Sequence, residues 1–130
     1  MIVSGIDHVV LRVTNMERAI DFYSDVLGCR VEHRQDALGL VHLRAGTSLI
    51  DLIDVAGKLG RMGGSAPGSE GRNVDHICLR IADFDVDRIT RELTAKGVSL
   101  GETAQRFGST GEATSIYLTD PEGNGLELRA

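Results

Sequence analysis

The chain has 130 residues, of which 42% are hydrophobic and 25% are charged. This composition suits one compact globular domain or two small modules that share a core. The formal net charge is −5 and only 4% of the residues are aromatic, so the sequence favours neither a nucleic-acid partner nor an anionic membrane, both of which call for a basic surface.

The first half of the chain is predicted to form a strand, a helix and three further strands. Apolar residues alternate along residues 6–13, which is typical of a strand. Thr14 or Asn15 can cap a helix that begins at Met16, and Gly28 can end it. Glycine-containing turns then separate three predicted strands: 30–34, 40–45 and 49–53.

Residues 54–73 form a segment of a different kind. It contains six glycines and Pro67, and it is interpreted mainly as a flexible connector between two modules. A lid that closes over a binding site is the alternative.

The second half repeats the plan of the first. A strand is predicted at 74–81, followed by a helix that Asp83 or Asp85 caps and that runs to about Lys96. Residues 101–113 are polar and contain glycine, and they are expected to form a loop. The remaining predicted strands are 98–100, 114–118 and 126–129. The fold class is therefore α+β, with tandem βαβββ modules at about 4–55 and 73–130 in one domain, joined by a connector at about 56–72.

Two short patterns appear once in each module. Asp-His-Val-Val-Leu-Arg-Val at 7–13 recurs as Asp-His-Ile-Cys-Leu-Arg-Ile at 75–81. A second pattern, at 47–52 and at 123–128, holds a carboxylate between two apolar residues in each copy. The duplication therefore supplies one imidazole and one carboxylate per module.

These four polar side chains are predicted to bind a metal ion. By strand alternation, each points away from the apolar face of its strand, toward the concave side of a curved, cup-shaped sheet. Ionisable groups that meet inside a protein need a cationic partner, and a divalent metal provides one. The predicted ligands are His8, Asp51, His76 and Glu127. Such a set suits Ni, Co, Zn, Mn or Fe, and the sequence does not choose among them.

The alternative for a lone strand histidine is an ordinary hydrogen-bonded core residue. Repetition at equivalent positions favours the ligand interpretation for His8 and His76. His33 and His42 have no such counterparts, so they are interpreted as surface or ordinary strand residues. Cys78 is expected to be a buried, inert thiol rather than a nucleophile.

The chain resembles the vicinal oxygen chelate superfamily, which includes glyoxalase I, methylmalonyl-CoA epimerase, fosfomycin-resistance thiol transferases, extradiol dioxygenases and bleomycin-binding proteins. The first module carries a glyoxalase I pattern at 8–13, Phe22-Tyr23 and Leu27-Gly28. The closing motif is Asp-Pro-Glu-Gly-Asn-Gly-Leu-Glu-Leu at 120–128. The likeness covers nearly the whole chain and is closest in pattern to glyoxalase I-type members.

This resemblance implies a homodimer with sites at its interface, because glyoxalase I takes two of its four ligands from each subunit. Asp51 stands where glyoxalase I has Glu. Arg12 matches an arginine that contacts the glutathione end of the glyoxalase I substrate. Arg80 shares the corresponding face in the second module, and both arginines could hold a substrate carboxylate. Salt bridging at the strand ends is the alternative for both.

The chemistry that the superfamily shares is chelation of two neighbouring substrate oxygens by the metal. A carboxylate beside the metal then moves a proton between adjacent carbons. Glu127 is the first candidate for this base and Asp51 the second, because the longer Glu side chain moves more freely. The expected function is a glyoxalase I-like lyase or isomerase, or an epimerase, acting on a small molecule. A thiol-transferase resistance enzyme, which generally uses three protein ligands, and a non-catalytic binding module are the alternatives.

The cysteine content and the N-terminal sequence indicate a cytoplasmic protein. Cys29 and Cys78 are the only cysteines, and isolated thiols are typical of a reducing compartment. The first residues lack the basic and apolar stretches of a secretion signal. No run approaches the roughly 18 apolar residues that a membrane span needs.

Overall fold

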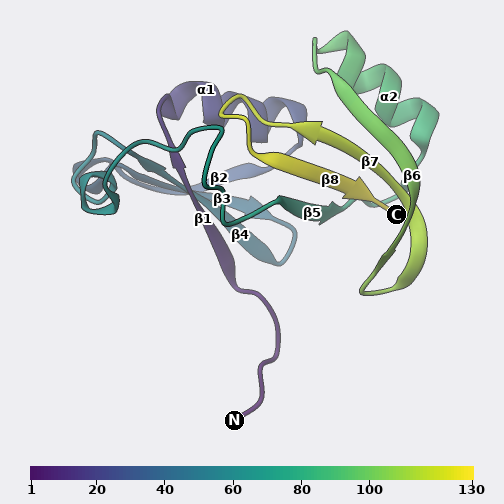
Figure 1. Ribbon diagram of the computed structural model, residues 1–130, viewed down its shortest axis with the longest axis horizontal. Helices are drawn as coiled ribbons and strands as arrows, with labels where there is room; N and C mark the ends of the chain where they lie inside the picture. The colour runs from purple at the N-terminus through teal and green to yellow at the C-terminus, as the bar shows by residue number, and fades with distance from the viewer. The chain divides into compact units, whose positions relative to one another are not determined.

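The structure is a computed structural model that describes residues 1–130. The chain divides into two compact units, Met1–Glu70 and Gly71–Ala130, and each unit carries one four-stranded sheet (Figure 1). Tandem βαβββ modules, as predicted from the sequence, are confirmed. Residues 56–70, expected to belong to a separate connector, are part of the first unit.

The first unit has the strand order β1-β4-β3-β2. β1 pairs with β4 in parallel, and the other neighbours are antiparallel. α1 packs against β4 on one face of this sheet (Figure 1). The elements are β1 (His8–Val13), α1 (Met16–Asp21), η1 (Phe22–Val26), β2 (Arg30–Gln35), η2 (Asp36–Leu38), β3 (Leu40–Ala45), β4 (Ser48–Asp54) and η3 (Gly60–Gly63).

The first helix begins where the sequence predicts. The Asn15 side chain accepts a hydrogen bond from the Arg18 backbone N–H at 3.0 Å, which satisfies one free donor of the first turn. The helix continues beyond Asp21 as a single π-helical turn, η1, and Gly28 follows with φ +74°. The core of this unit includes the fully buried side chains of Val13, Tyr23, Leu43 and Leu52.

The glycine-rich segment is more ordered than the sequence indicates. Its first part forms turns and the 3-10 helix η3, in which the Arg61 N–H donates to the Gly57 carbonyl at 3.1 Å. Gly60 is buried, and a Cβ atom there would lie 1.9 Å from the Asp54 carbonyl oxygen. Only glycine fits this close approach. Residues 64–75 contain no helix or strand.

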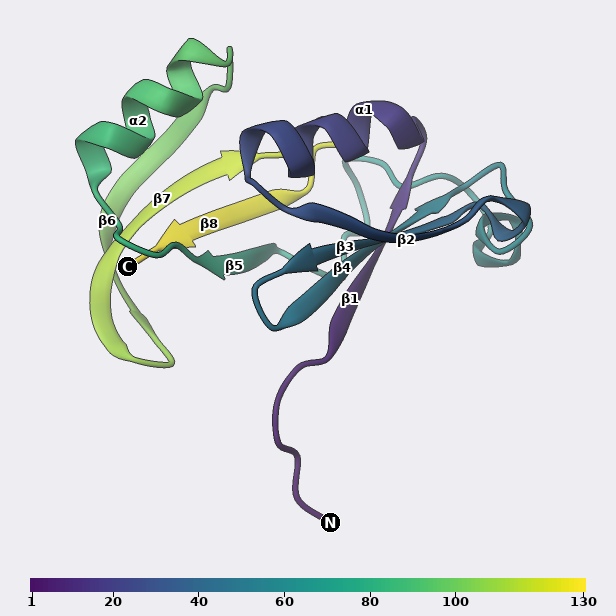
Figure 2. The same cartoon turned by 180° about the vertical axis from the view of Figure 1, so that it is seen from behind.

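The second unit repeats this topology with the order β5-β8-β7-β6. Asp85 caps α2 by accepting from the Arg88 N–H at 2.7 Å, and Gly97 ends it with φ +74°. α2 packs against β6 (Figure 2). The elements are β5 (His76–Arg80), α2 (Val86–Ala95), β6 (Leu100–Gly108), β7 (Gly111–Thr119) and β8 (Gly125–Arg129).

The prediction of a loop at 101–113 is wrong, because β6 and β7 form a long hairpin there. Backbone pairing does not depend on side-chain polarity, and polar cross-strand pairs stabilise an exposed strand. One such pair is Gln105 and Thr114, whose side chains are hydrogen-bonded at 2.7 Å. No helix of the structure has the length and apolar character needed to cross a membrane.

Candidate metal centre

In the second unit, His76 lies between two carboxylates. Its Nδ1 is 2.7 Å from Asp75 Oδ1, and its Nε2 is 3.0 Å from Glu127 Oε2. The hydrogen bond to Asp75 is the largest cause of a raised His76 pKa, and the nearby Glu127 charge adds to it against the opposing effect of burial. With Nδ1 donating to Asp75, Nε2 is the nitrogen that faces Glu127 and can accept a metal.

Glu127 is a buried carboxylate with defined hydrogen bonds. Its side chain is 7% exposed. Ser115 Oγ donates to the Oε1 atom. Burial raises the Glu127 pKa, but hydrogen bonds from Ser115 and Tyr117 and the charge of His76 outweigh burial, so the pKa is lowered. Glu127 is therefore ionised at neutral pH, which is the form that binds a metal or accepts a proton.

Cys78 is the β5 neighbour of Glu127, and Tyr117 is its β7 neighbour. The expectation of a buried thiol is wrong, because Cys78 is exposed. It is nevertheless a poor nucleophile. Partial burial and the charge of Glu127 raise the Cys78 pKa to about 11, so the reactive thiolate is scarce at neutral pH.

In the first unit, Asp51 lies on the same sheet face as Val10 and His42, with which it is in register. Its side chain is only 6% exposed. Asp51 Oδ1 lies 2.8 Å from His42 Nδ1, which is an ion pair when the imidazole is protonated, but neither of these buried atoms has a hydrogen-bond partner. A buried carboxylate oxygen in this state is costly unless a cation satisfies it.

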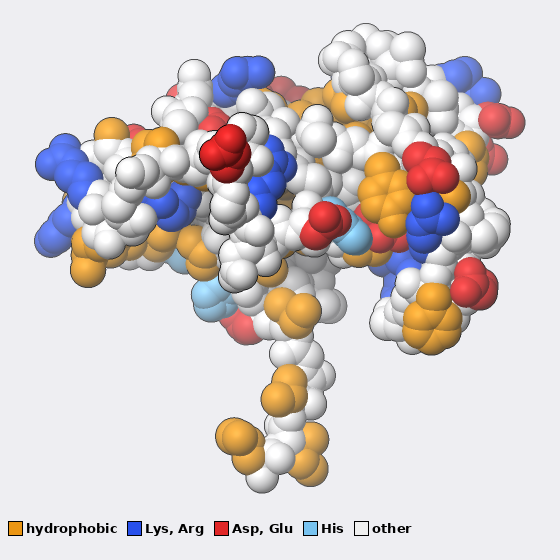
Figure 3. Space-filling model, viewed as in Figure 1, with side chains coloured by type: hydrophobic (Ala, Val, Ile, Leu, Met, Phe, Trp, Pro, Cys, Tyr) orange, Lys and Arg blue, Asp and Glu red, His pale blue; other side chains and the backbone are white.

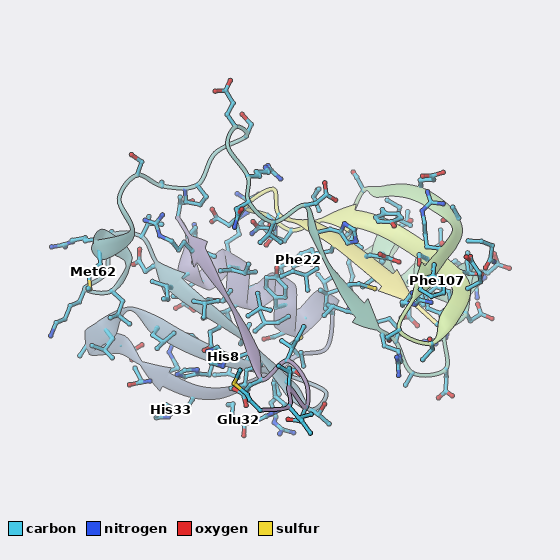
Figure 4. All side chains as sticks on the ribbon, turned by 60° about the horizontal axis from the view of Figure 1, so that its bottom comes forward. His8, Phe22, Glu32, His33, Met62 and Phe107 are labelled. Carbon is cyan, nitrogen blue, oxygen red and sulfur yellow. The ribbon has the colours of Figure 1, made fainter.

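His42 belongs to a row of polar side chains that the sequence interpretation missed. Gln35 Nε2 is 2.9 Å from His42 Nε2. The His33 ring stacks on the His42 ring at 5.8 Å between centroids. His33 lies on the outer strand β2, whereas His8 lies on β1 (Figure 4). The antiparallel register of β3 and β4 places His42 opposite Asp51, and no pattern within either strand alone indicates this pairing.

His8 shares with His76 the hydrogen bond to the preceding aspartate. Its Nδ1 is 2.7 Å from Asp7 Oδ1, and this hydrogen bond is the largest cause of a raised His8 pKa, to which the charge of Asp51 also contributes. The Asp-His dipeptide of each module thus directs one imidazole to present Nε2. The signal was visible in the sequence, because aspartate precedes histidine in both copies.

The side chains at the candidate site are of the kinds that bind divalent metals. Each unit supplies one imidazole whose Nδ1 is held by the preceding aspartate and one buried carboxylate, and Asp51 Oδ1 has no hydrogen-bond partner. The structure itself gathers no cluster of three or more His, Cys, Asp or Glu side chains that could hold an ion. The four-ligand set therefore stays a prediction.

The arginines predicted to bind substrate have different contacts. Arg12 holds the glycine-rich segment: Nη1 donates to the Ser65 carbonyl at 2.9 Å, and Nη2 donates to the carbonyls of Gly60 and Gly64 at 3.0 and 2.8 Å. Arg80 donates to Ser109 Oγ at 3.0 Å. Neither forms the salt bridge considered as an alternative, and their role toward substrate stays a prediction.

The tandem βαβββ architecture, in which one histidine and one acid recur at equivalent strand positions of both modules, defines a protein of the vicinal oxygen chelate fold. The family model described as "Glyoxalase/Bleomycin resistance protein/Dioxygenase superfamily" matches residues 5–128. The chain belongs to this superfamily.

Relatives of the chain carry several functional names. It is 33% identical over 134 residues to virulence protein STM3117 of Salmonella typhimurium, covering 98% of this chain and 85% of the relative. It is 28% identical over 127 residues to the metallothiol transferase FosB of Staphylococcus haemolyticus, covering 97% and 83%. The crystal structure of STM3117 superimposes with a TM-score of 0.80 at 27% identity, covering 99% of this chain and 98% of that one.

A further solved structure shares the fold alone. Lactoylglutathione lyase from Agrobacterium tumefaciens matches with a TM-score of 0.70 at 22% identity, covering 97% of this chain and 92% of that chain. The comparisons thus establish the superfamily and the fold, and different activities occur among the relatives.

Proposed function

We propose that the chain is a divalent-metal-dependent lyase or isomerase, of glyoxalase I or epimerase type, that moves a proton on a small oxygenated substrate. The observation that carries this proposal is the contact between His76 Nε2 and the buried, ionised Glu127 carboxylate. His8 and Asp51 occupy the equivalent strand positions in the other unit, where Asp51 contacts His42 instead of His8, and this equivalence of position supports the proposal.

The metal would be held by His8, Asp51, His76 and Glu127, and Ni, Co, Zn, Mn or Fe would suit these ligands. When bound, a divalent ion supplies Lewis acidity that stabilises negative charge on substrate oxygens. The Asp7 and Asp75 carboxylates hold the two imidazoles in the orientation that presents Nε2.

Glu127 is the proposed base. Its lowered pKa keeps the carboxylate ionised, so that Oε2 can take a proton from one substrate carbon and return it to the neighbouring carbon. The Ser115 hydroxyl holds Oε1 and leaves Oε2 directed toward His76. Asp51 is the second candidate, and Arg12 and Arg80 are the proposed substrate-binding residues.

The proposed assembly is a homodimer with its sites at the interface. Apolar side chains on the N-terminal segment are exposed, among them Ile2 at 94% and Ile6 at 74%, as Figure 3 shows for the segment that leads into β1. Exposed apolar side chains of this kind support association.

The proposal is tested by metal analysis combined with a proton-exchange assay. We expect the protein as isolated to carry about one divalent ion per chain, and His8→Ala and Glu127→Ala to lose most of it, as removal of a direct ligand would cause. Hemithioacetals and 2-substituted acyl thioesters are then incubated with the protein in D₂O. Metal-dependent deuterium incorporation would support the proposal, and its absence from both substrate classes would contradict it.

A thiol-transferase function is the second candidate. It is favoured by the similarity to a metallothiol transferase and by the position of Asp51, which already contacts His42 at 2.8 Å. Members of that group generally use three protein ligands, so Asp51 would be spare. Full metal affinity in Asp51→Ala would favour this function, whereas loss of affinity would favour the four-ligand enzyme. A protein that binds no metal at all would be a non-catalytic binding module.

A further inference from the structure

Two arginines of the second unit lack an acidic partner. Arg80 on β5 and Arg129 on β8 are direct neighbours in the parallel register. By alternation, both lie on the sheet face that carries His76 and Glu127. Neither guanidinium takes part in an ion pair, although the chain is acidic overall, with a net charge of −5.

Arg129 is unusual because it is buried as well as unpaired. The residue is only 5% exposed, and its Nε has no hydrogen-bond partner. Its one hydrogen bond runs from Nη2 to the Gly111 carbonyl at 2.8 Å. Removing a cation from water without a counter-charge is unfavourable, so an anion would complete this environment.

The tip of the β6–β7 hairpin holds both guanidiniums. Arg80 Nη2 donates to Ser109 Oγ at 3.0 Å, one residue from Gly108. A Cβ atom at Gly108 would lie 1.4 Å from Arg129 Nη1. Because glycine has no side chain, the Arg129 guanidinium can occupy this space. The tip therefore fixes two cations at one place through a glycine and a serine.

This place adjoins the proposed catalytic carboxylate. Cys78 is the register partner of Glu127, and Arg80 and Arg129 pair two residues further along the same two strands, so alternation places all four side chains on one face. An anion held by the two arginines would thus lie on the same face as Glu127, close to Cys78.

We propose that Arg80 and Arg129 form a subsite for an oxyanion group, a carboxylate or a phosphate-type group, of the small-molecule substrate. Guanidinium groups bind such oxygens through paired, charge-assisted hydrogen bonds. The assignment to substrate rests on the proposed function, whereas the anion site itself does not require a metal.

The test is an NMR titration of the full-length protein, followed through the Nε–H resonances of its arginines, in EDTA and at constant ionic strength. The probes are sodium acetate and inorganic phosphate, each compared with sodium chloride. We expect the Arg129 resonance to shift saturably with one or both oxyanions and not with chloride. A response to acetate alone indicates a carboxylate subsite, and a response to phosphate alone indicates a phosphate-type subsite.

Three variants make the titration specific. Arg80→Gln, at an exposed position, should weaken binding at least about tenfold, as expected for loss of a charged hydrogen-bond donor. Gly108→Ala keeps both charges but displaces the Arg129 guanidinium, and it should abolish the saturable shift. Arg91→Gln, on the exposed surface of α2, should bind as the wild type does.

Three outcomes would overturn the proposal: no saturable shift in the wild type, unchanged affinity in Arg80→Gln, or binding that appears only without EDTA. The last would place the anion on a metal instead of on the arginines. Because the titration is done in EDTA, a failure of the proposed metal-dependent function leaves its result unaffected, and the two failures can be told apart.

Discussion

At the scale of single residues, Asp51 combines deep burial with an unsatisfied carboxylate oxygen. Such a group costs free energy in the metal-free protein. We predict that Asp51→Leu, which keeps the branch at Cγ, raises the free energy of unfolding by about 1–2 kcal/mol. The measurement is urea denaturation in EDTA.

The matched control for this prediction is Asp21→Leu, which changes an exposed aspartate of the same unit and should alter stability by less than about 0.5 kcal/mol. A destabilised Asp51→Leu would mean that the contact with His42 stabilises the fold and that Asp51 is a structural residue. Added divalent metal should stabilise the wild type and not the Asp51→Leu variant.

The His76–Glu127 contact leads to a prediction about pH. The raised His76 pKa stabilises the fold at pH values below the unfolded value of about 6.5, and this contribution is lost as pH rises through the folded pKa. The lowered Glu127 pKa contributes above about pH 4.3 and is lost as pH falls through the folded pKa. The pair should therefore stabilise the fold most between these limits.

A double-mutant cycle with His76→Gln and Glu127→Gln, carried out by denaturant unfolding in EDTA, checks this expectation. The coupling free energy should be larger at pH 5.5 than at pH 8.5. Equal coupling at both pH values would show that the contact does not depend on the imidazolium form. A cycle between Glu32 and Arg44, whose cation does not titrate in this range, serves as the control.

The sequence predicted the residues that each strand presents, but not the partners that pairing brings to them. Alternation was sufficient to place His8 on the face opposite Val9 and Leu11, because it depends on a single strand. The contact of Asp51 with His42 depends on the register between two strands, and so does the pairing of Arg80 with Arg129. Register is fixed by turns and packing, which single-strand patterns do not report.

At the scale of elements, prediction succeeded where an apolar pattern and a cap agreed. Asn15 and Asp85 both cap the helices that they were expected to start. It failed for residues 101–113, which form most of β6 and the start of β7, where exposed polar residues alternate with partly buried ones and Gly108 and Gly111 lie at the hairpin tip. The hairpin is held by backbone pairing and by contacts of its tip with Arg80 and Arg129, none of which is visible as local hydrophobic periodicity.

The contact of Arg12 with the glycine-rich segment leads to a prediction about local stability. Three hydrogen bonds hold residues 60–65 to β1 through one guanidinium. Arg12→Gln should free this segment while leaving the core intact, and trypsin should then cleave after Arg61 several-fold faster. Limited proteolysis followed by mass spectrometry measures the rate at this one bond.

Arg18→Gln, on the exposed face of α1, removes an arginine of the same unit without touching the segment, and it should leave the cleavage rate unchanged. If Arg12→Gln were also cleaved at the wild-type rate, the three hydrogen bonds would contribute nothing to the order of the segment. A substrate anion that competes for Arg12 should, by the same reasoning, accelerate cleavage of the wild type.

At the scale of the whole molecule, the four predicted ligands divide evenly between the two units. His8 and Asp51 lie in Met1–Glu70, and His76 and Glu127 lie in Gly71–Ala130. A complete site therefore needs one unit of each kind, taken either from a single chain or from two chains of a dimer. The two assemblies can be distinguished by mixing chains that carry different ligand substitutions.

We predict that chains carrying His8→Ala and chains carrying Glu127→Ala, each inactive alone, regain metal binding when they are refolded together. In a mixed dimer with shared sites, one site receives both changes and the other receives neither. Random association makes about half of the dimers mixed, so about one quarter of the wild-type metal content should return. Metal analysis after gel filtration measures it. If each site is built within one chain, every site keeps one defect and no metal content returns, whatever the proportion of mixed dimers.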